Sequence, residues 1–237
     1  RGLGDVYKRQ GSNDQALVKV TETILQTYTA SIDPCLLSGK FLVLHRILSS
    51  IRKHTQDRVI IVSNFTSTLN LLQRYCVRQK FPFLRLDGRT KADVRSKMVN
   101  EFNSDSGSDH LGKQPFVFLL SSKSGGVGLN LIGANRLILF DSDWNPATDR
   151  QAMARIHRDG QLKPCFIYRL LLVGSMDEKI YQRQITKIGL SDSLMSNEAA
   201  KDHDVASSSD TFSQEELRDV FGYHPNTTCL THDLLGC

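Results

Sequence analysis

Residues 116–146 read FVFLLSSKSGGVGLNLIGANRLILFDSDWNP, two apolar runs separated by a glycine-rich loop. The runs at 116–120 and 136–140 are short and continuous, which is typical of strands buried on both faces of a parallel sheet. Gly125, Gly126 and Gly128 follow the first run and would let the backbone approach a ligand closely. A tight turn also needs glycine, so the loop alone leaves a phosphate-binding role and a structural role open.

Strand and helix patterns alternate on both sides of this stretch. A run of β-branched residues at 59–62 predicts another buried strand, and apolar residues at helical spacing predict helices between the strands. This alternation predicts a doubly wound α/β fold with its functional loops at the carboxyl ends of the strands. We expect strands at 59–62, 81–86, 116–120, 136–140 and 165–172, and helices at 13–31, 39–51, 69–77, 94–102 and 149–157.

The rest of the chain predicts one α/β domain with extensions at both ends. Residues 1–10 show neither periodicity nor a core pattern and are expected to be a non-native tail, and the chain is expected to be a piece of a longer protein. A charged helix at 175–195 carries charged residues at almost every other position, so we expect it to pack back on the α/β lobe while staying outside the core. We predict a helical lead-in at 11–38, the α/β lobe at 39–174, a surface insertion at 103–114, a polar linker at 196–211 and a small C-terminal segment at 212–237, which opens with a helix capped by Ser213 and Glu216.

Composition excludes several classes of protein. The 237 residues are 40% hydrophobic with a net charge of +5, and no apolar run is long enough for a membrane span. Five cysteines, without a leading signal segment, argue against a secreted disulfide scaffold and for a reducing compartment. Residues 40–97 carry 13 Lys and Arg against three Asp, whereas residues 192–233 carry nine acids against two bases. The basic stretch can face a polyanion, or it can simply be a solvated helix surface.

A second polar motif, QAMARIHRDGQ, occupies residues 151–161. Arg155 and Arg158 are three residues apart, so on a helix both guanidinium groups would lie on one face and converge on one anion. Two arginines on a helix are also typical of a solvated basic face. Beside a glycine loop on an α/β scaffold, the pair favours contact with a nucleotide γ-phosphate.

These motifs together resemble the second RecA-like lobe of superfamily-two helicase motors of the SWI/SNF class. RVIIVS at 58–63, RLDG at 85–88, SGGVGLNL with DSDWNP, and QAMARIHRDGQ resemble the fourth motif, the segment after it, and the fifth and sixth motifs, in that order. DSDWNP and the R-x-x-R-x-G-Q pattern disfavour an RNA helicase. Within the class, LLSSKSGGVGLNLIGAN, PATDRQAMARIHRDGQ, DEKIYQRQ and CLTHDLLGC are similar to the Rad fifty-four type recombination-repair translocases, particularly the B branch. His157 departs from the Trp that many of those relatives carry.

The resemblance implies a role for each matching residue. Arg155 and Arg158 would be the catalytic residues that contact the γ-phosphate of ATP, which the absent first lobe would hold with Mg²⁺. The remaining implied residues are Gly126, Gly128 and Gln151 for ATP binding, Arg89, Thr90, Lys91, Ser122 and Lys123 for the DNA backbone, and Trp144 for coupling the two sites, although a single tryptophan beside a proline is also typical of packing.

The function that the resemblance implies is the second motor lobe of an ATP-dependent double-stranded DNA translocase and chromatin remodeller. It would act in the nucleus in homologous recombination and DNA repair, with a RecA-like recombinase filament and nucleosomes as partners and without a membrane. The chain contains no G-x-x-x-x-G-K-[ST] loop, so we expect it to be inactive alone. The alternatives are another SWI/SNF-class remodeller or a non-catalytic DNA-binding scaffold.

A cysteine–histidine cluster lies at the C-terminus. Cys229, His232 and Cys237 have the spacing of zinc ligands, but a structural site needs four, so the fourth would lie beyond the chain or be His224. We therefore expect at most a structural Zn²⁺ shared with residues outside this sequence. Cys35, Cys76 and Cys165 lie in apolar surroundings and are predicted to be core residues.

Overall fold

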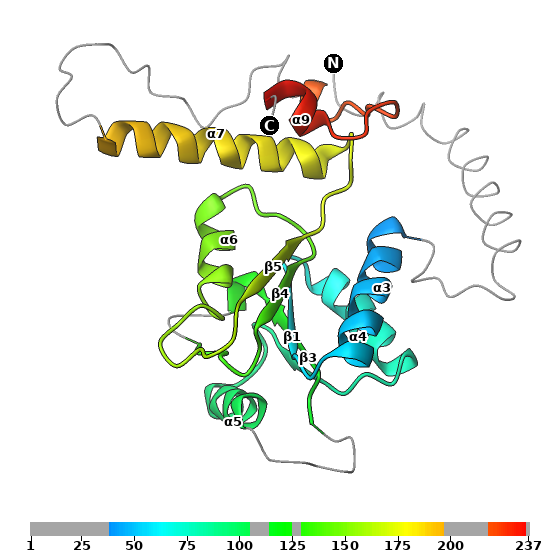
Figure 1. Ribbon diagram of the computed structural model, residues 1–237, viewed down its shortest axis with the longest axis vertical. Helices are drawn as coiled ribbons and strands as arrows, with labels where there is room; N and C mark the ends of the chain where they lie inside the picture. The colour runs from blue at the N-terminus through cyan, green and yellow to red at the C-terminus, as the bar shows by residue number, and fades with distance from the viewer. Residues whose placement is uncertain (1–37, 105–113, 125–128, 197–217, 236–237) are drawn as a thin grey trace, which may run out of the picture. The chain divides into compact units, whose positions relative to one another are not determined.

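The computed structural model describes residues 38–104, 114–124, 129–196 and 218–235 (Figure 1). The chain divides into two units, Arg1–Leu44 and His45–Cys237. Of the first unit only residues 38–44 are described, and they contain the first turns of a helix that continues into the second unit. The second unit contains the sheet and both sites described below.

The described residues form one five-stranded sheet in the order β2-β3-β1-β4-β5, and every strand pair is parallel. The three inner strands are β3 (Val117–Ser121), β1 (Val59–Ser63) and β4 (Arg136–Leu139), and β1 and β3 are buried along their whole length. The edge strands are β2 (Phe83–Leu86) and β5 (Phe166–Arg169), and the first two residues of β5 are exposed. The parallel sheet confirms the predicted doubly wound α/β fold.

Helices cover both faces of this sheet (Figure 1). On one face lie α4 (Thr66–Arg78), which buries Leu69 and Leu72, and the second half of α3 (Gly39–His54). On the other face α5 (Ala92–Asn103) and α6 (Pro146–Met153) close a core that includes Phe102, Phe118 and Ala152. Because successive strand residues point to opposite faces, each central strand contributes to both cores.

The prediction for α6 was wrong at both ends. The helix begins at Pro146 rather than at residue 149, because the side chain of Asn145 accepts a backbone N–H at 3.0 Å and proline is well suited to the first turn. The helix ends at Met153 rather than at residue 157. Beyond it, the carbonyl of Arg155 accepts the N–H of Leu131 at 3.1 Å, so the chain bonds to another loop instead of continuing the helix.

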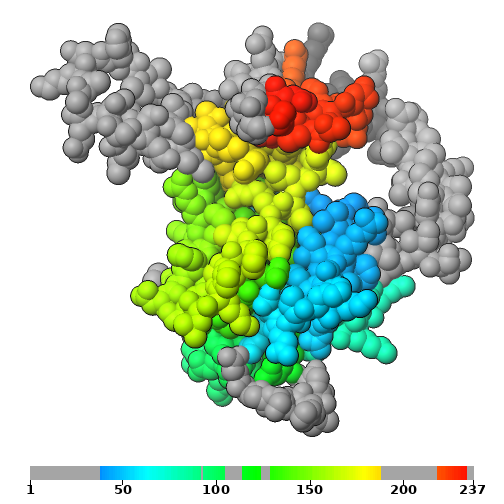
Figure 2. Space-filling view, in the orientation of Figure 1, coloured from blue at the N-terminus to red at the C-terminus, as the bar shows by residue number. Residues whose placement is uncertain are grey.

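The prediction that the charged helix lies outside the core was also wrong. It is α7 (Met176–Ser196), and the side chains of Glu178, Lys179, Ile180 and Gln184 on it are buried. In Figure 2 the yellow surface of α7 continues into the yellow-green surface of β5 and the residues before it. Charged and polar groups are buried here because each has a hydrogen-bonding partner.

A short C-terminal segment binds the first turn of α7. Glu178 accepts the backbone N–H groups of Gly174 and Thr231, each at 2.7 Å, and Lys179 pairs with Asp219 at 2.8 Å. Burial opposes ionisation of Glu178, but these hydrogen bonds outweigh it and hold the pKa of the carboxyl below its ordinary value. Thr231 belongs to α9 (Leu230–Leu235), so this buried carboxylate joins two distant parts of the sequence.

The turn before α7 depends on a glycine. Gly174 has a φ of +67°, and a Cβ at this position would lie 2.1 Å from the carbonyl oxygen of His224. Any larger residue would therefore displace the C-terminal segment. Of the helix predicted at 212–221, residues 218–220 are helical, and Ser213 and Glu216 lie outside the described residues. In the described part of the chain, no helix combines the length and the apolar character needed to cross a bilayer.

Candidate functional site

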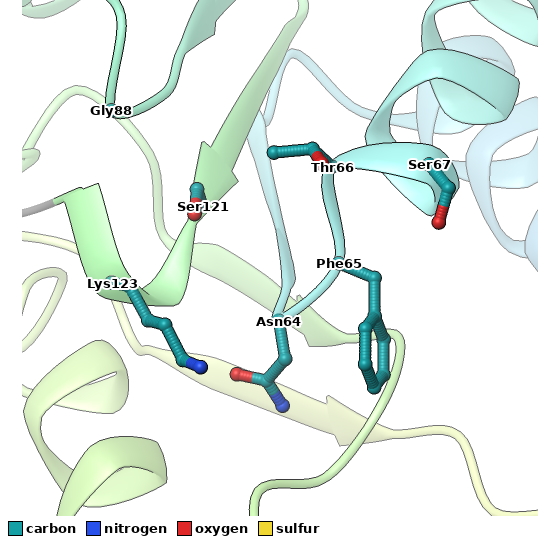
Figure 3. A pocket seen from close by; sticks show the side chains of 7 residues that line it. All are labelled: Asn64, Phe65, Thr66, Ser67, Gly88, Ser121 and Lys123. Carbon is teal, nitrogen blue, oxygen red and sulfur yellow. The ribbon is translucent and has the colours of Figure 1, made fainter.

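A pocket lies at the carboxyl ends of β1, β2 and β3, and we refer to it as the strand-end pocket (Figure 3). Its volume is about 340 Å³. Ligands of doubly wound proteins commonly bind at this edge of the sheet. None of the described residues that line it is acidic; they are Asn64, Phe65, Thr66, Ser67, Gly88, Ser121 and Lys123.

Hydrogen bonds between neighbouring strand ends fix one wall of the pocket. The carboxylate of Asp141, which follows β4, accepts the hydroxyl of Ser63 at 2.5 Å and the backbone N–H of Asn64 at 2.6 Å. The hydroxyl of Ser122 donates to the carboxamide oxygen of Asn64. The Asn64 side chain is therefore held in one orientation, and in Figure 3 it extends to the same side of the pocket as Lys123.

The structure brings together only some of the predicted DNA contacts. Lys123 lines the pocket and is exposed, and Ser122 lies beside it on the short 3-10 helix η2 (Ser122–Ser124). Arg89, Thr90 and Lys91 form the turn that follows the pocket residue Gly88, but none of the three lines the pocket.

Asp87 holds this turn in place. Its carboxylate accepts the N–H of Arg89 at 3.0 Å, its own N–H donates to the hydroxyl of Thr90 at 3.2 Å, and it pairs with Arg85 at 2.9 Å. The Thr90 hydroxyl therefore has a partner inside the turn, whereas Arg89 and Lys91 are exposed.

Sequence reasoning missed the first turn of α4 as part of the pocket. Phe65 occupies the N-cap position and its side chain makes no capping hydrogen bond, so the first N–H groups of the helix are not capped by that residue. Thr66 and Ser67 are exposed beside them, and Phe65 is 60% exposed. The polar Ser63–Asn64 pair directly after a buried strand was the signal that could have identified this wall.

Arg155 and Arg158 lie beyond α6, in a segment of turns that we call the arginine segment (residues 155–161). The expectation that both arginines lie on one face of a helix was therefore wrong. Arg155 is buried and Arg158 is exposed. Burial lowers the pKa of the Arg155 guanidinium, and the positive charge of Arg158 lowers it further.

Hydrogen bonds to neighbouring loops hold the arginine segment. The carboxamide nitrogen of Gln161 donates to the carbonyl of Ala134 at 2.8 Å and to those of Ile132 and Ile156, each at 3.2 Å. Asn103 in turn donates to the carbonyl of Asn130 at 2.7 Å. These contacts join the segment to the loop at 129–134 and make it a rigid support for the two arginines.

Arg158 lines a second hollow of about 420 Å³ together with Asn130 and Asp159. The carboxamide oxygen of Asn130 is buried and has no hydrogen-bond partner among the described residues. A buried polar atom without a partner is uncommon, and together with the exposed guanidinium it offers both a fixed dipole and a positive charge to a polar ligand.

Comparisons with known proteins agree with this geometry. The family described as "Helicase conserved C-terminal domain" matches residues 39–160, about half of the chain. The chain belongs to this helicase family. Four strands of its sheet (β1 to β4), its strand-end pocket and most of the arginine segment lie inside the matched region, whereas Gln161, β5, α7 and the C-terminal segment lie outside it.

Curated relatives extend the likeness beyond this helicase domain. The chain is 50% identical to "DNA repair and recombination protein RAD54-like" of Drosophila pseudoobscura pseudoobscura over 202 residues, which cover 85% of this chain and 24% of that protein. It is 48% identical to RAD54 of Oryza sativa subsp. japonica, covering 85% and 20%, and 47% identical to human RAD54B, covering 90% and 23%. The chain thus spans about a quarter of the length of the curated relatives it matches.

A solved structure supports the RecA-like fold of the helicase domain. The structure titled "Crystal structure of the C-terminal part of Fun30 ATPase domain" is 36% identical, with a TM-score of 0.59, and the match covers 71% of this chain and 52% of that one. This likeness and the relatives named RAD54 confirm the resemblance to SWI/SNF-class lobes of the recombination-repair type that the sequence motifs indicated.

Other predicted site residues of the helicase domain receive no further support. Gly126 and Gly128 lie outside the described residues, Gln151 is exposed on α6, and Trp144 is 41% exposed in the turn before it. Their roles in nucleotide binding and coupling stay predictions.

The predicted zinc ligands are not gathered into a site by the described residues. Cys229 donates its thiol to Glu178 at 3.7 Å and accepts the N–H of His232 at 3.4 Å, and Cys237 lies outside the described part. Among the described residues no group of three or more His, Cys, Asp or Glu side chains could hold a metal. Cys76 is buried and its pKa is raised to about 12, as expected of a core thiol.

Proposed function

We propose that this chain is the second motor lobe of an ATP-dependent double-stranded DNA translocase. Arg158 carries the proposal: an exposed guanidinium lines a hollow, in the same segment as a buried second arginine, and Gln161 joins this segment to the loop at 129–134 through two hydrogen bonds. Such a fixed positive charge can stabilise the negative charge that develops on a transferred phosphoryl group.

The nucleotide site would be completed only when two lobes meet. ATP with Mg²⁺ would be held mainly by a first lobe, and it supplies the phosphoryl group that is transferred to water. Arg158 would reach the γ-phosphate directly, Arg155 would support it from behind, and Gln151, Gly126 and Gly128 would complete the nucleotide pocket. Because the motif that cradles phosphates does not occur in this chain, the chain alone would not hydrolyse ATP.

The strand-end pocket would grip the DNA backbone. Lys123 supplies positive charge, and the hydroxyl groups of Thr66 and Ser67 and the first N–H groups of α4 can donate to phosphate oxygens. Ser122, whose hydroxyl donates to Asn64, would position that side chain for the same grip. Arg89, Thr90 and Lys91 would extend this grip along the strand. Contacts of this kind bind DNA without regard to sequence and weaken as the salt concentration rises.

The biological setting follows from the relatives rather than from the geometry. Proteins named for DNA repair and recombination share up to half of this sequence over most of its length. We therefore place the motor in homologous recombination in the nucleus, with recombinase filaments and nucleosomal DNA as its partners.

Movement along DNA is the output to test. A chain that carries both lobes should displace a third strand from a triplex on linear duplex DNA when ATP is present, and should not do so with a non-hydrolysable analogue. A scaffold module would bind the duplex equally well but leave the third strand in place with either nucleotide, and that result would refute the proposal.

A further inference from the structure

A carboxylate is buried on α6, the helix that leads into the arginine segment. Asp149, in the first turn of α6, is 3% exposed. One of its oxygens accepts the carboxamide of Gln184 at 2.9 Å and pairs with Arg169 at 3.2 Å, and the other accepts the N–H of Asp143 at 3.4 Å. Burial raises the pKa of Asp149, which shows that desolvation outweighs these partners. Such a carboxylate is costly unless its partners stay in place.

Gln184, like Arg169, comes from outside the matched helicase domain. It lies on α7 and is only 1% exposed. Its nitrogen donates to the carboxylate of Asp149 and to the backbone carbonyl of Asp143, and its oxygen accepts from the guanidinium of Arg169. One carboxamide therefore joins α6, the turn before α6 and β5, and a neutral side chain with both a donor and an acceptor is needed to do so.

This contact bears on the arginine segment because α6 leads directly into it. Ala152, one turn after Asp149 on the buried side of the helix, accepts the N–H of Arg155 at 3.2 Å. The N–H of Ala154 donates to the carbonyl of Arg150 at 2.9 Å. The position of α6 therefore sets the point from which Arg155 and Arg158 extend.

We infer that Gln184 is a positioning residue for nucleotide hydrolysis: by holding Asp149 and the Asp143 carbonyl, it sets the end of α6 from which Arg155 and Arg158 reach the nucleotide. The inference rests on the proposed function. It gives α7 a part in the reaction although α7 lies outside the region that the helicase family matches.

The first test replaces Gln184 by Met in a chain that carries both lobes, with Gln182→Met as the matched control. Gln182 lies on the same helix but donates to Thr231 at 3.3 Å, away from α6. Gln184→Met should lower kcat by about 10- to 100-fold, as expected when reacting groups are misplaced by about 1 Å. The KM for ATP and the affinity for duplex DNA should change little, and Gln182→Met should keep the wild-type kcat. Thermal unfolding of each variant shows whether it is folded at the assay temperature.

The second test reverses donor and acceptor. Asp149→Asn and Gln184→Glu each remove the amide–carboxylate pair, whereas the double variant restores it with the carboxylate still beside Arg169. The single variants should lose hydrolysis, and the double variant should lose less than the sum of the two single losses, because the amide–carboxylate pair is restored although the donor to the Asp143 carbonyl is not. Such a coupling is what an interacting pair shows. This comparison decides the matter even if Gln184→Met does not fold.

The outcomes separate this inference from the proposed function. If the wild-type chain with both lobes shows no DNA-stimulated hydrolysis, the proposed function fails and the inference fails with it. If the wild type hydrolyses ATP and Arg158→Ala does not, a folded Gln184→Met with the wild-type kcat overturns the inference alone. A double variant whose loss equals the sum of the two single losses overturns it as well.

Discussion

The strand-end pocket and the arginine segment belong to the same lobe but are built in opposite ways. Five of the described pocket residues, Phe65, Thr66, Ser67, Gly88 and Lys123, are exposed, although Asn64 is held by a hydrogen bond and Ser121 is buried. In the arginine segment Arg155 is buried, and Gln161 holds three backbone carbonyls. An open wall suits a grip that must let go of successive phosphates, whereas a fixed cation suits stabilisation of a transition state.

The largest effect should come from Arg158, the exposed arginine of the arginine segment. Arg158→Ala, in a chain with both lobes, should lower ATP turnover by about a thousandfold, roughly 4 kcal/mol, because a fixed arginine is worth that much in phosphoryl transfer. Steady-state hydrolysis with saturating duplex DNA measures it. Arg150→Ala is the control, an exposed arginine on α6 that should keep turnover near the wild-type value.

A second prediction concerns stability, where the two regions should also differ. Gln161→Leu removes three hydrogen bonds to backbone carbonyls and should lower the free energy of unfolding by about 1–3 kcal/mol. Ser67→Ala, in the open pocket, should change it by less than about 0.5 kcal/mol. Urea unfolding of this chain measures both. Equal losses would show that the two regions are equally rigid.

The C-terminal segment should respond to acid. Because the native pKa of Glu178 lies below its ordinary value, the carboxylate stabilises the fold above the unfolded-state pKa of about 4.3, and this contribution is lost as the pH falls through the native pKa. Glu178→Gln should lower Tm at neutral pH by about 2–4 °C, the shift that 1 kcal/mol gives in a domain of this size. The difference between variant and wild type should shrink below about pH 4. A difference that stays constant between neutral pH and pH 3 would contradict this account.

The smallest effect should come from Lys123, the exposed lysine of the strand-end pocket. Lys123→Ala should weaken duplex binding a few-fold and reduce the slope of log affinity against log salt by about 0.9, the value for one phosphate contact. Lys163→Ala is the control, since Lys163 pairs with Asp57 just before β1, at the opposite edge of the sheet. An unchanged slope for Lys123→Ala would remove that lysine from the proposed grip.

The strands of the sheet could be predicted from sequence because each one is marked by a run of consecutive apolar residues. The runs at 59–62, 116–120 and 136–140 consist largely of branched and aromatic residues that are buried on both faces, and each became a strand. Lys123 was named as a DNA contact from the family resemblance; the structure places it on the wall of the pocket, and its role stays a prediction. Asn64, Phe65 and the first turn of α4 were missed because nothing in one sequence shows which turns meet at one edge.

The end of α6 and the burial of α7 were harder to predict, because both depend on contacts between residues far apart in the sequence. The start of α6 was readable from Asn145 and Pro146, but its end depends on a bond between Arg155 and the loop at residue 131. The burial of α7 could not be predicted because its polar groups find partners elsewhere: Gln184 binds Asp149, and Glu178 binds Thr231. A charged helix without those partners would indeed remain outside the core.

We propose that the lobe has two separate sites, the arginine segment for ATP hydrolysis and the strand-end pocket for DNA binding. One paired measurement tests this most directly. The kcat of DNA-stimulated ATP hydrolysis and the dissociation constant for duplex DNA would be measured together for Arg158→Ala and Lys123→Ala in a chain with both lobes. We predict that Arg158→Ala loses kcat and keeps DNA affinity, and that Lys123→Ala loses DNA affinity and keeps kcat at saturating DNA. If both substitutions change the same quantity, the strand-end pocket and the arginine segment are not separate functional sites, and the proposal is wrong.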